Sequence, residues 1–236
     1  MSDFSEAFGL IFKKNGLEEF VAFADKFEFL YDKLTEVNRS LNLTSITERD
    51  EVIVKHFADC VRVARYIPIN AEAVDVGCGG GFPCLPLAIV RPAIKILAVD
   101  SVAKKLAFVD GVSRDLGLSV GVAAARAEEL GREETLRQHF DVCVSRAVAR
   151  LDILSELCVP LVRVGGLFVS MKGSGGLAEL EEAENGLKTL GARTAIRDGF
   201  TLSDGSDRYI FCFEKVADTP DMYPRKYSKI KKEPLR

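Results

Sequence analysis

The sequence predicts an α/β fold built on an open, mostly parallel sheet of seven strands. Short apolar runs alternate with helix-like segments along most of the chain, as strands joined by crossover helices do. A glycine-rich turn at 77–81 separates the first run from a helix, as in nucleotide-binding βαβ units. The last two runs have no helix between them, which predicts an antiparallel final strand.

The βαβ unit begins with the run 73–76, which is interrupted by Asp75 and leads into the glycine turn. A helix is expected at 85–90, and a second strand, 94–99, ends on Asp100. Glycines allow positive φ and a close approach of the backbone to a ligand, while an acid after the next strand accepts both ribose hydroxyls. The unit therefore predicts a site for a cofactor that carries adenosine.

The remaining elements follow in chain order. Ser101 is the expected N-cap of a helix that starts near Val102 and ends before Gly117. Helices are also expected from 147 to about 162 and at 177–190, and the other strands at 120–125, 141–145, 167–171, 194–197 and 209–214. Ligands bind at the carboxyl ends of such strands. The residues expected to converge on that rim are Gly77, Asp100, Ala127, Ser145, Arg146 and Lys172.

Upstream of the sheet, aromatic and aliphatic residues recur at spacings of three and four over 4–36, which predicts one helix packed on the main domain. The segment 51–67 predicts a second amphipathic helix, on which His56 and Asp59 share a side. The polar loop 38–47 either forms a turn and helix cap or lines the mouth of the site. The expected parts are a helical cap at 1–70, a cofactor-binding domain at 71–216 and a basic tail at 217–236.

Composition indicates a globular cytoplasmic protein with no membrane segment. The chain has 236 residues, 47% of them apolar, and no apolar run approaches the ~20 residues that cross a bilayer. The N-terminal ten residues carry acids and no basic region, so no secretory signal is expected. Six cysteines without a C-x-x-C pair, and two histidines, argue against a metal site and suit a reducing compartment.

The net charge of −3 is unevenly distributed. Segment 224–236 has six basic residues and one acid, a net charge of +5 that leaves −8 for the remainder. An acidic body with a basic tail indicates either contact with nucleic acid or a solvated terminus, and composition by itself slightly favours the terminus.

The glycine turn distinguishes between cofactors. A dinucleotide fingerprint has a third glycine where this chain has Phe82, followed by Pro83, and the bulk there opposes a pyrophosphate. S-adenosylmethionine has no phosphate. The pattern Gly77-x-Gly79-x-Gly81 followed by Phe82-Pro83 resembles the first motif of class I methyltransferases, so the methyl donor is favoured over a dinucleotide.

A specific combination of motifs extends from about residue 35 to the C-terminus. It comprises Asn42-Leu43-Thr44, His56, Asp59, the glycine turn with Asp75 and Pro83, Leu85-Pro86-Leu87, Asp100-Ser101, Lys104-Lys105, Arg126-Ala127-Glu128-Glu129, Ser145-Arg146-Ala147, Lys172-Gly173, Arg208 and Lys232-Glu233-Pro234-Leu235. This combination resembles the ribosomal RNA small-subunit methyltransferase G family, also called glucose-inhibited division protein B. The resemblance implies a Rossmann-like class I fold and methyl transfer from S-adenosylmethionine to N7 of a guanine in 16S ribosomal RNA. It also implies a partner, 16S ribosomal RNA in the small ribosomal subunit or its precursor, and we expect a monomer.

By position, the resemblance assigns cofactor contacts to Gly77, Phe82, Ala127, Glu128 and Arg146. The glycine pattern adds Gly79 and Gly81, and the end of the second strand adds Asp100 as the ribose acceptor. Arg146 is expected to hold the cofactor carboxylate or a phosphate, or else to pair with Asp141. The candidates for contact with the RNA backbone are Arg126, Lys172, Arg208, Arg225 and Lys226.

Guanine N7 carries a lone pair and no proton, so its methylation requires no general base and no covalent nucleophile. We therefore expect no catalytic residue in the strict sense and catalysis by proximity and orientation. Ser145-Arg146-Ala147 is neither the Pro-Cys of cytosine C5 methylation nor the Asn/Asp-Pro-Pro-aromatic of amino methylation. The alternatives are a methyltransferase for a small molecule or protein, which leaves the basic tail unexplained, and a dinucleotide dehydrogenase, which Phe82-Pro83 disfavours.

Overall fold

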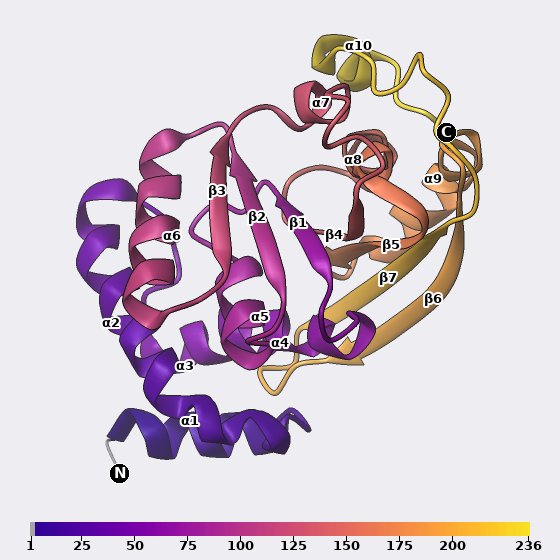
Figure 1. The fold of residues 1–236 in the computed structure, drawn as a ribbon. Helices are drawn as coiled ribbons and strands as arrows, with labels where there is room; N and C mark the ends of the chain where they lie inside the picture. The colour runs from indigo at the N-terminus through magenta and orange to yellow at the C-terminus, as the bar shows by residue number, and fades with distance from the viewer. Residues whose placement is uncertain (1–2) are drawn as a thin grey trace.

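The computed structural model describes residues 3–236 and contains one seven-stranded sheet with the order β3-β2-β1-β4-β5-β7-β6 (Figure 1). The strands are β1 (Glu72–Val76), β2 (Lys95–Asp100), β3 (Val120–Ala124), β4 (Phe140–Arg146), β5 (Val162–Lys172), β6 (Ala192–Thr201) and β7 (Asp207–Lys215). The five strands from β3 to β5 in this order pair in parallel. Strand β7 pairs antiparallel with both β5 and β6, which confirms the predicted class I arrangement.

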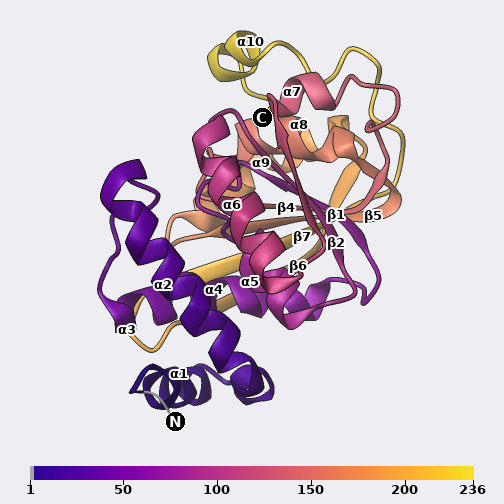
Figure 2. The same cartoon turned by 60° about the vertical axis from the view of Figure 1, so that its left-hand side comes forward.

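Successive strand residues point to opposite sides of the sheet, so both faces carry apolar side chains. Helices cover both faces and bury them. In β1, Ala73 packs with α5 (Cys84–Val90), α6 (Ala103–Leu116) and the N-terminal helices, whereas Val74 and Val76 face the other layer. That second layer contains α7 (Ala127–Leu130), α8 (Leu151–Cys158) and α9 (Gly176–Thr189). Figure 2 shows α2 and α6 on one side of the strands, with α8 and α9 on the other.

The helical N-terminal extension is present, but the expectation of a single helix over 4–36 is wrong. Helix α1 (Asp3–Lys14) ends two residues before Gly16, whose φ of +64° is left-handed. A 3₁₀ turn (Glu18–Phe23) then precedes α2 (Ala24–Leu41). The turn lets α1 fold back on α2, so that Phe8 and Phe27 meet with ring centroids 5.0 Å apart. Residues 1 and 2 of the expected cap lie outside the described residues.

A second helical stretch packs between this cap and the sheet. It runs through α3 (Arg49–Val52), a π-helical turn (Ile53–Ala58), α4 (Asp59–Val61) and a 3₁₀ turn (Arg62–Tyr66). Its apolar side, including Phe57, is fully buried in the same core as α5. The amphipathic segment predicted at 51–67 is therefore helical.

The C-terminal tail is packed against the sheet domain, contrary to the solvated terminus that composition favoured. Helix α10 (Tyr227–Lys232) lies beside α7 (Figure 1). Ile230 is fully buried, and the guanidinium of Arg225 binds the fully buried carboxylate of Glu156 with a closest distance of 2.7 Å. A buried ion pair of this kind fixes the path of the tail.

Within residues 3–236, no helix is long and apolar enough to cross a membrane. The same residues contain no group of three or more histidine, cysteine, aspartate or glutamate side chains that could hold a metal ion.

Candidate active site

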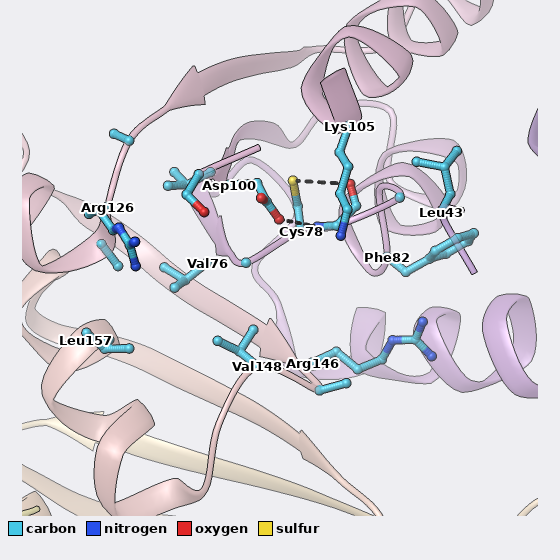
Figure 3. Close-up of a pocket in the computed structure, with 18 of the residues that line it drawn as sticks. Leu43, Val76, Cys78, Phe82, Asp100, Lys105, Arg126, Arg146, Val148 and Leu157 are labelled. Atoms are coloured by element: carbon cyan, nitrogen blue, oxygen red, sulfur yellow. Dashed lines mark hydrogen bonds between the residues drawn. The ribbon is translucent and has the colours of Figure 1, made fainter. Parts of the chain in front are cut away.

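A cavity of about 420 Å³ opens at the carboxyl ends of β1, β2, β3 and β4 (Figure 3). It lies where the sheet order reverses direction, the usual place for a ligand in an open α/β sheet. The predicted site residues that line it are Gly77, Gly79, Phe82, Asp100, Arg126, Ala127, Glu128 and Arg146. These residues follow four strands that are far apart along the chain, and the sequence analysis predicted all of them as site residues.

The glycine turn brings backbone to the cavity wall. Gly77 has a φ of +73°, and a Cβ there would lie 2.3 Å from Cγ2 of Val148. Gly81, with a φ of +87°, does not line the cavity; a Cβ there would lie 2.4 Å from Cδ1 of Leu85 in α5. Gly81 therefore shapes the turn against its helix, while Gly77 and Gly79 leave space for a ligand.

Asp100 connects the glycine turn to the start of α6. Its Oδ2 accepts a hydrogen bond from the N–H of Gly79 at 3.0 Å, and its Oδ1 accepts one from Val102 N–H at 2.8 Å. The N-cap of α6 is Val102 and no side chain caps the helix, so the predicted serine cap at Ser101 is wrong. Each carboxylate oxygen has further acceptor capacity, so the group is held in a fixed orientation and can still receive ribose hydroxyls.

The opposite end of the cavity contains a buried polar cluster around Arg146. Its Nη1 donates to Asp59 Oδ2 at 3.2 Å and to the carbonyl of Lys55 at 3.0 Å, and its Nη2 donates to His56 Nδ1 at 2.9 Å. The considered pairing with Asp141 does not occur, because Asp141 binds Arg163 at 2.7 Å. The terminal nitrogens of Arg146 therefore hold protein groups at the cavity wall.

His56 has a defined tautomer, because a guanidinium only donates hydrogen bonds. Nδ1 accepts from Arg146, so Nε2 carries the proton and donates to Thr44 Oγ1 at 2.8 Å. Burial, and then the charge of Arg146, lower the pKa of His56 to about 3. The imidazole is neutral and stacks on Phe82 with ring centroids 4.5 Å apart. Thr44 also lines the cavity, so the loop 38–47 does reach the mouth of the site.

Two of the candidate RNA contacts, Lys172 and Arg208, line a second cavity of about 600 Å³ on the other side of Arg146. The ammonium of Lys172 donates to the carbonyl of Ala149 at 2.6 Å and pairs with Glu179 at 2.8 Å. Arg208 lies 3.7 Å from Asp59. The two cavities share His56, Arg146, Ala147 and Val148, so an acceptor in the second would lie next to a donor in the first.

The remaining RNA candidates differ from one another. The guanidinium of Arg225 is engaged by Glu156, so we assign it to anchoring the tail. Lys226 is exposed, and Arg126 lies at the cavity with its Cζ 5.9 Å from the ring of Tyr227. Sequence reasoning did not identify Tyr227 or Leu157, both of which line the cavity, because their positions depend on how the tail and α8 pack.

Comparison with known proteins decides the family. The family model described as rRNA small subunit methyltransferase G (GidB) matches residues 24–201. The chain belongs to this family. Proteins named ribosomal RNA small subunit methyltransferase G share 43% identity over 89% of the chain and 90% of the relative in Halalkalibacterium halodurans, and 40% over 98% of both chains in Oceanobacillus iheyensis.

Several solved structures have a similar fold. TYW2 of M. jannaschii, solved in complex with AdoMet, has a TM-score of 0.53 at 15% identity and covers 67% of this chain and 75% of its own. TrmN from Thermus thermophilus has a TM-score of 0.52 at 20% identity, over 66% of this chain and 47% of its own. As a member of the methyltransferase G family, the chain is an S-adenosylmethionine-dependent ribosomal RNA methyltransferase.

Proposed function

We propose that this enzyme methylates N7 of a guanine in 16S ribosomal RNA and that its chemistry requires no general base. The observation that carries this proposal is the state of His56. Both ring nitrogens are hydrogen-bonded within the protein, and the pKa is lowered to about 3, so the imidazole is poorly suited to remove a proton. Methylation at N7 has no proton to remove.

The cavity fits S-adenosylmethionine by its size and by its wall. The left-handed glycines form a cradle that a Cβ would fill, and the carboxylate of Asp100 is held in place by two backbone N–H groups. We assign Gly77, Gly79 and Phe82 to the methionine side, Asp100 to the ribose, and Ala127 and Glu128 to the adenine side. When bound, the cofactor supplies an electrophilic methyl group.

The protein residues then act by holding the two reactants in position. Arg146 and His56 line both cavities, so they contact the donor in one and the acceptor in the other and hold the two side by side. Orientation of this kind supplies about 7–11 kcal/mol of a reaction barrier when the reacting atoms are well aligned. Phe82, stacked on His56, holds the wall rigid at this point.

The RNA is proposed to reach the site over the rim that carries Arg126, Lys172 and Arg208, with Lys226 of the tail beside it. We propose that the substrate is the small ribosomal subunit or its precursor in the cytoplasm and that the active form is a monomer. The helical cap (1–70), the cofactor-binding domain (71–216) and the basic tail (217–236) would then divide the functions of positioning, cofactor binding and RNA contact.

A methyl-transfer assay with labelled S-adenosylmethionine tests this function. The substrates are 30S particles that lack the modification, naked 16S RNA, and an extract of proteins and metabolites. Label in 7-methylguanosine after digestion of the RNA is the expected result. Label in another nucleoside would contradict the N7 assignment, and label only in the extract would favour a small-molecule or protein substrate. Asp100→Ala should lose activity, whereas Lys95→Ala, exposed at the opposite end of the same strand, should retain it.

A further inference from the structure

One end of the cofactor cavity is formed by the C-terminal tail. Tyr227, the first residue of α10, lines the cavity together with Arg126, Ala127 and Leu157. In Figure 3, Arg126 and Leu157 lie at one end of the cavity, and Phe82 and Leu43 lie at the other. Tyr227 belongs to the first end, because its ring centroid is 5.9 Å from Cζ of Arg126.

The position of Asp100 determines which part of the cofactor lies at that end. Asp100 ends β2, between the glycine turn after β1 and the Arg126 segment after β3. A ribose at Asp100, with the methionine part on the glycine turn, leaves the base at the Arg126 end. We propose that Tyr227 binds the adenine ring of S-adenosylmethionine, so that the tail completes the cofactor site. This inference rests on the proposed function.

A tyrosine is suited to this position. Adenine is a flat aromatic ring, and stacking on an aromatic side chain is a common way for proteins to hold a base. The ring of Tyr227 is half-buried and packs against the core formed by α8 and α9, which leaves part of it open to the cavity.

Contacts on both sides of Tyr227 hold the tail in place. Before it, Arg225 binds the buried Glu156 through Nε and Nη2, and its backbone N–H donates to the same carboxylate at 2.7 Å. After it, Ile230 is fully buried and Arg236 pairs with Asp152 at 3.0 Å. The tyrosine is thus positioned before any ligand arrives, and the entropy of ordering the tail does not oppose cofactor binding.

Calorimetry on the full chain with two ligands tests the inference. S-adenosylmethionine carries both adenosine and the methionine tail, whereas 5′-methylthioadenosine carries the adenosine without the amino acid. Tyr227→Ala should weaken both by a similar factor, about tenfold, since one base–aromatic stack is lost in each case. Tyr227→Phe, which keeps the ring, should bind both within about twofold of the wild type. Ser228→Ala, on the exposed side of the same helix, is the matched control.

Tyr227→Leu separates loss of stacking from loss of packing, because it retains apolar bulk. It should show the same weakening as Tyr227→Ala while its thermal unfolding without ligand matches the wild type. Unchanged affinity for both ligands in Tyr227→Ala would overturn the inference and leave the proposed function standing. Weakening for S-adenosylmethionine alone would also overturn it, because Tyr227 would then be at the methionine end. A wild-type chain that binds neither ligand would overturn the proposed function itself.

Discussion

The imidazole of His56 lies parallel to the ring of Phe82, with centroids 4.5 Å apart and planes inclined by 18°. This pair joins the N-terminal helical stretch to the glycine turn, and Arg146 of β4 lies beside it with its Cζ 5.5 Å from the Phe82 ring. Three segments therefore meet at one neutral histidine.

The pH dependence of stability should show two buried groups acting in opposite directions. Burial lowers the pKa of His56 to about 3, so the unfolded state binds more protons below pH 6.5, and stability is lost as the pH falls from there. Burial raises the pKa of Asp75 to about 7, so the folded state keeps a proton that the unfolded state releases, and stability falls as the pH rises from about 4 to 7.

His56→Gln should leave the Asp75 effect unopposed, so its free energy of unfolding should fall between pH 5 and pH 7 relative to the wild type. Asp75→Asn should show the reverse. Each effect approaches about 1.4 kcal/mol per pH unit at most. Urea unfolding from pH 5 to pH 8 measures both, and His139→Gln, at a position where the side chain is 46% exposed, is the control. Parallel curves for all variants would contradict the assignment.

Gly77→Ala should weaken S-adenosylmethionine binding and lower stability by about 1–2 kcal/mol, because its φ of +73° is costly for any residue with a Cβ. The new methyl group also meets Val148 at the cavity wall and displaces it. Calorimetry and thermal unfolding are the measurements. Gly175→Ala has open space and an ordinary φ of −77°, so equal losses in the two variants would rule out this explanation.

Arg225→Ala should destabilise the protein by about 3–5 kcal/mol, since it leaves the fully buried carboxylate of Glu156 without its cation. Lys226→Ala changes the exposed neighbouring residue and should alter stability by less than about 0.5 kcal/mol. Denaturant unfolding distinguishes the two. Adding Glu156→Gln to Arg225→Ala should recover part of the loss, and no recovery would mean that the buried charge is not its cause.

Lys226→Ala should act on RNA binding instead. If Lys226 contacts a phosphate, its removal reduces the salt dependence of RNA affinity by about one unit of slope in log K against log salt. Lys13→Ala, on α1 at the far side of the molecule, should leave the slope unchanged (Figure 1). Equal slopes for wild type and Lys226→Ala would remove this lysine from the RNA surface.

Most of the sheet was predictable from sequence because its central strands contain short apolar runs, and the rim followed from the rule that ligands lie at carboxyl ends. The edge strand β6 is longer than predicted because its polar residues, such as Arg197 and Asp198, form no apolar run. The break at Gly16 was missed because the phenylalanines of α1 and α2 keep a helical spacing on both sides of it. Ser101 does not cap α6 because the helix starts later, with Val102 as its N-cap, and the carboxylate of Asp100 binds the N–H of Val102.

The tail was the least predictable part. Its lysines indicate solvent or nucleic acid, and nothing local shows that Arg225 has a buried partner 69 residues earlier. One available signal was Glu156, an acid among the apolar residues of the helix at 151–158, because a fully buried carboxylate requires a partner from elsewhere in the chain. The position of Tyr227 at the cavity depends on that ion pair, and no sequence pattern around Tyr227 predicts it.

The cavity takes one wall from Leu43 and Thr44, before the first strand, and another from Tyr227, after the last strand. A nascent chain emerging from the ribosome therefore has no finished cavity until residues 217–236 are free to fold back on α8. Prematurely terminated chains that end before the tail would contain all seven strands and still have an open site. Folding of segment 217–236 onto the sheet domain thus completes the wall of the cavity.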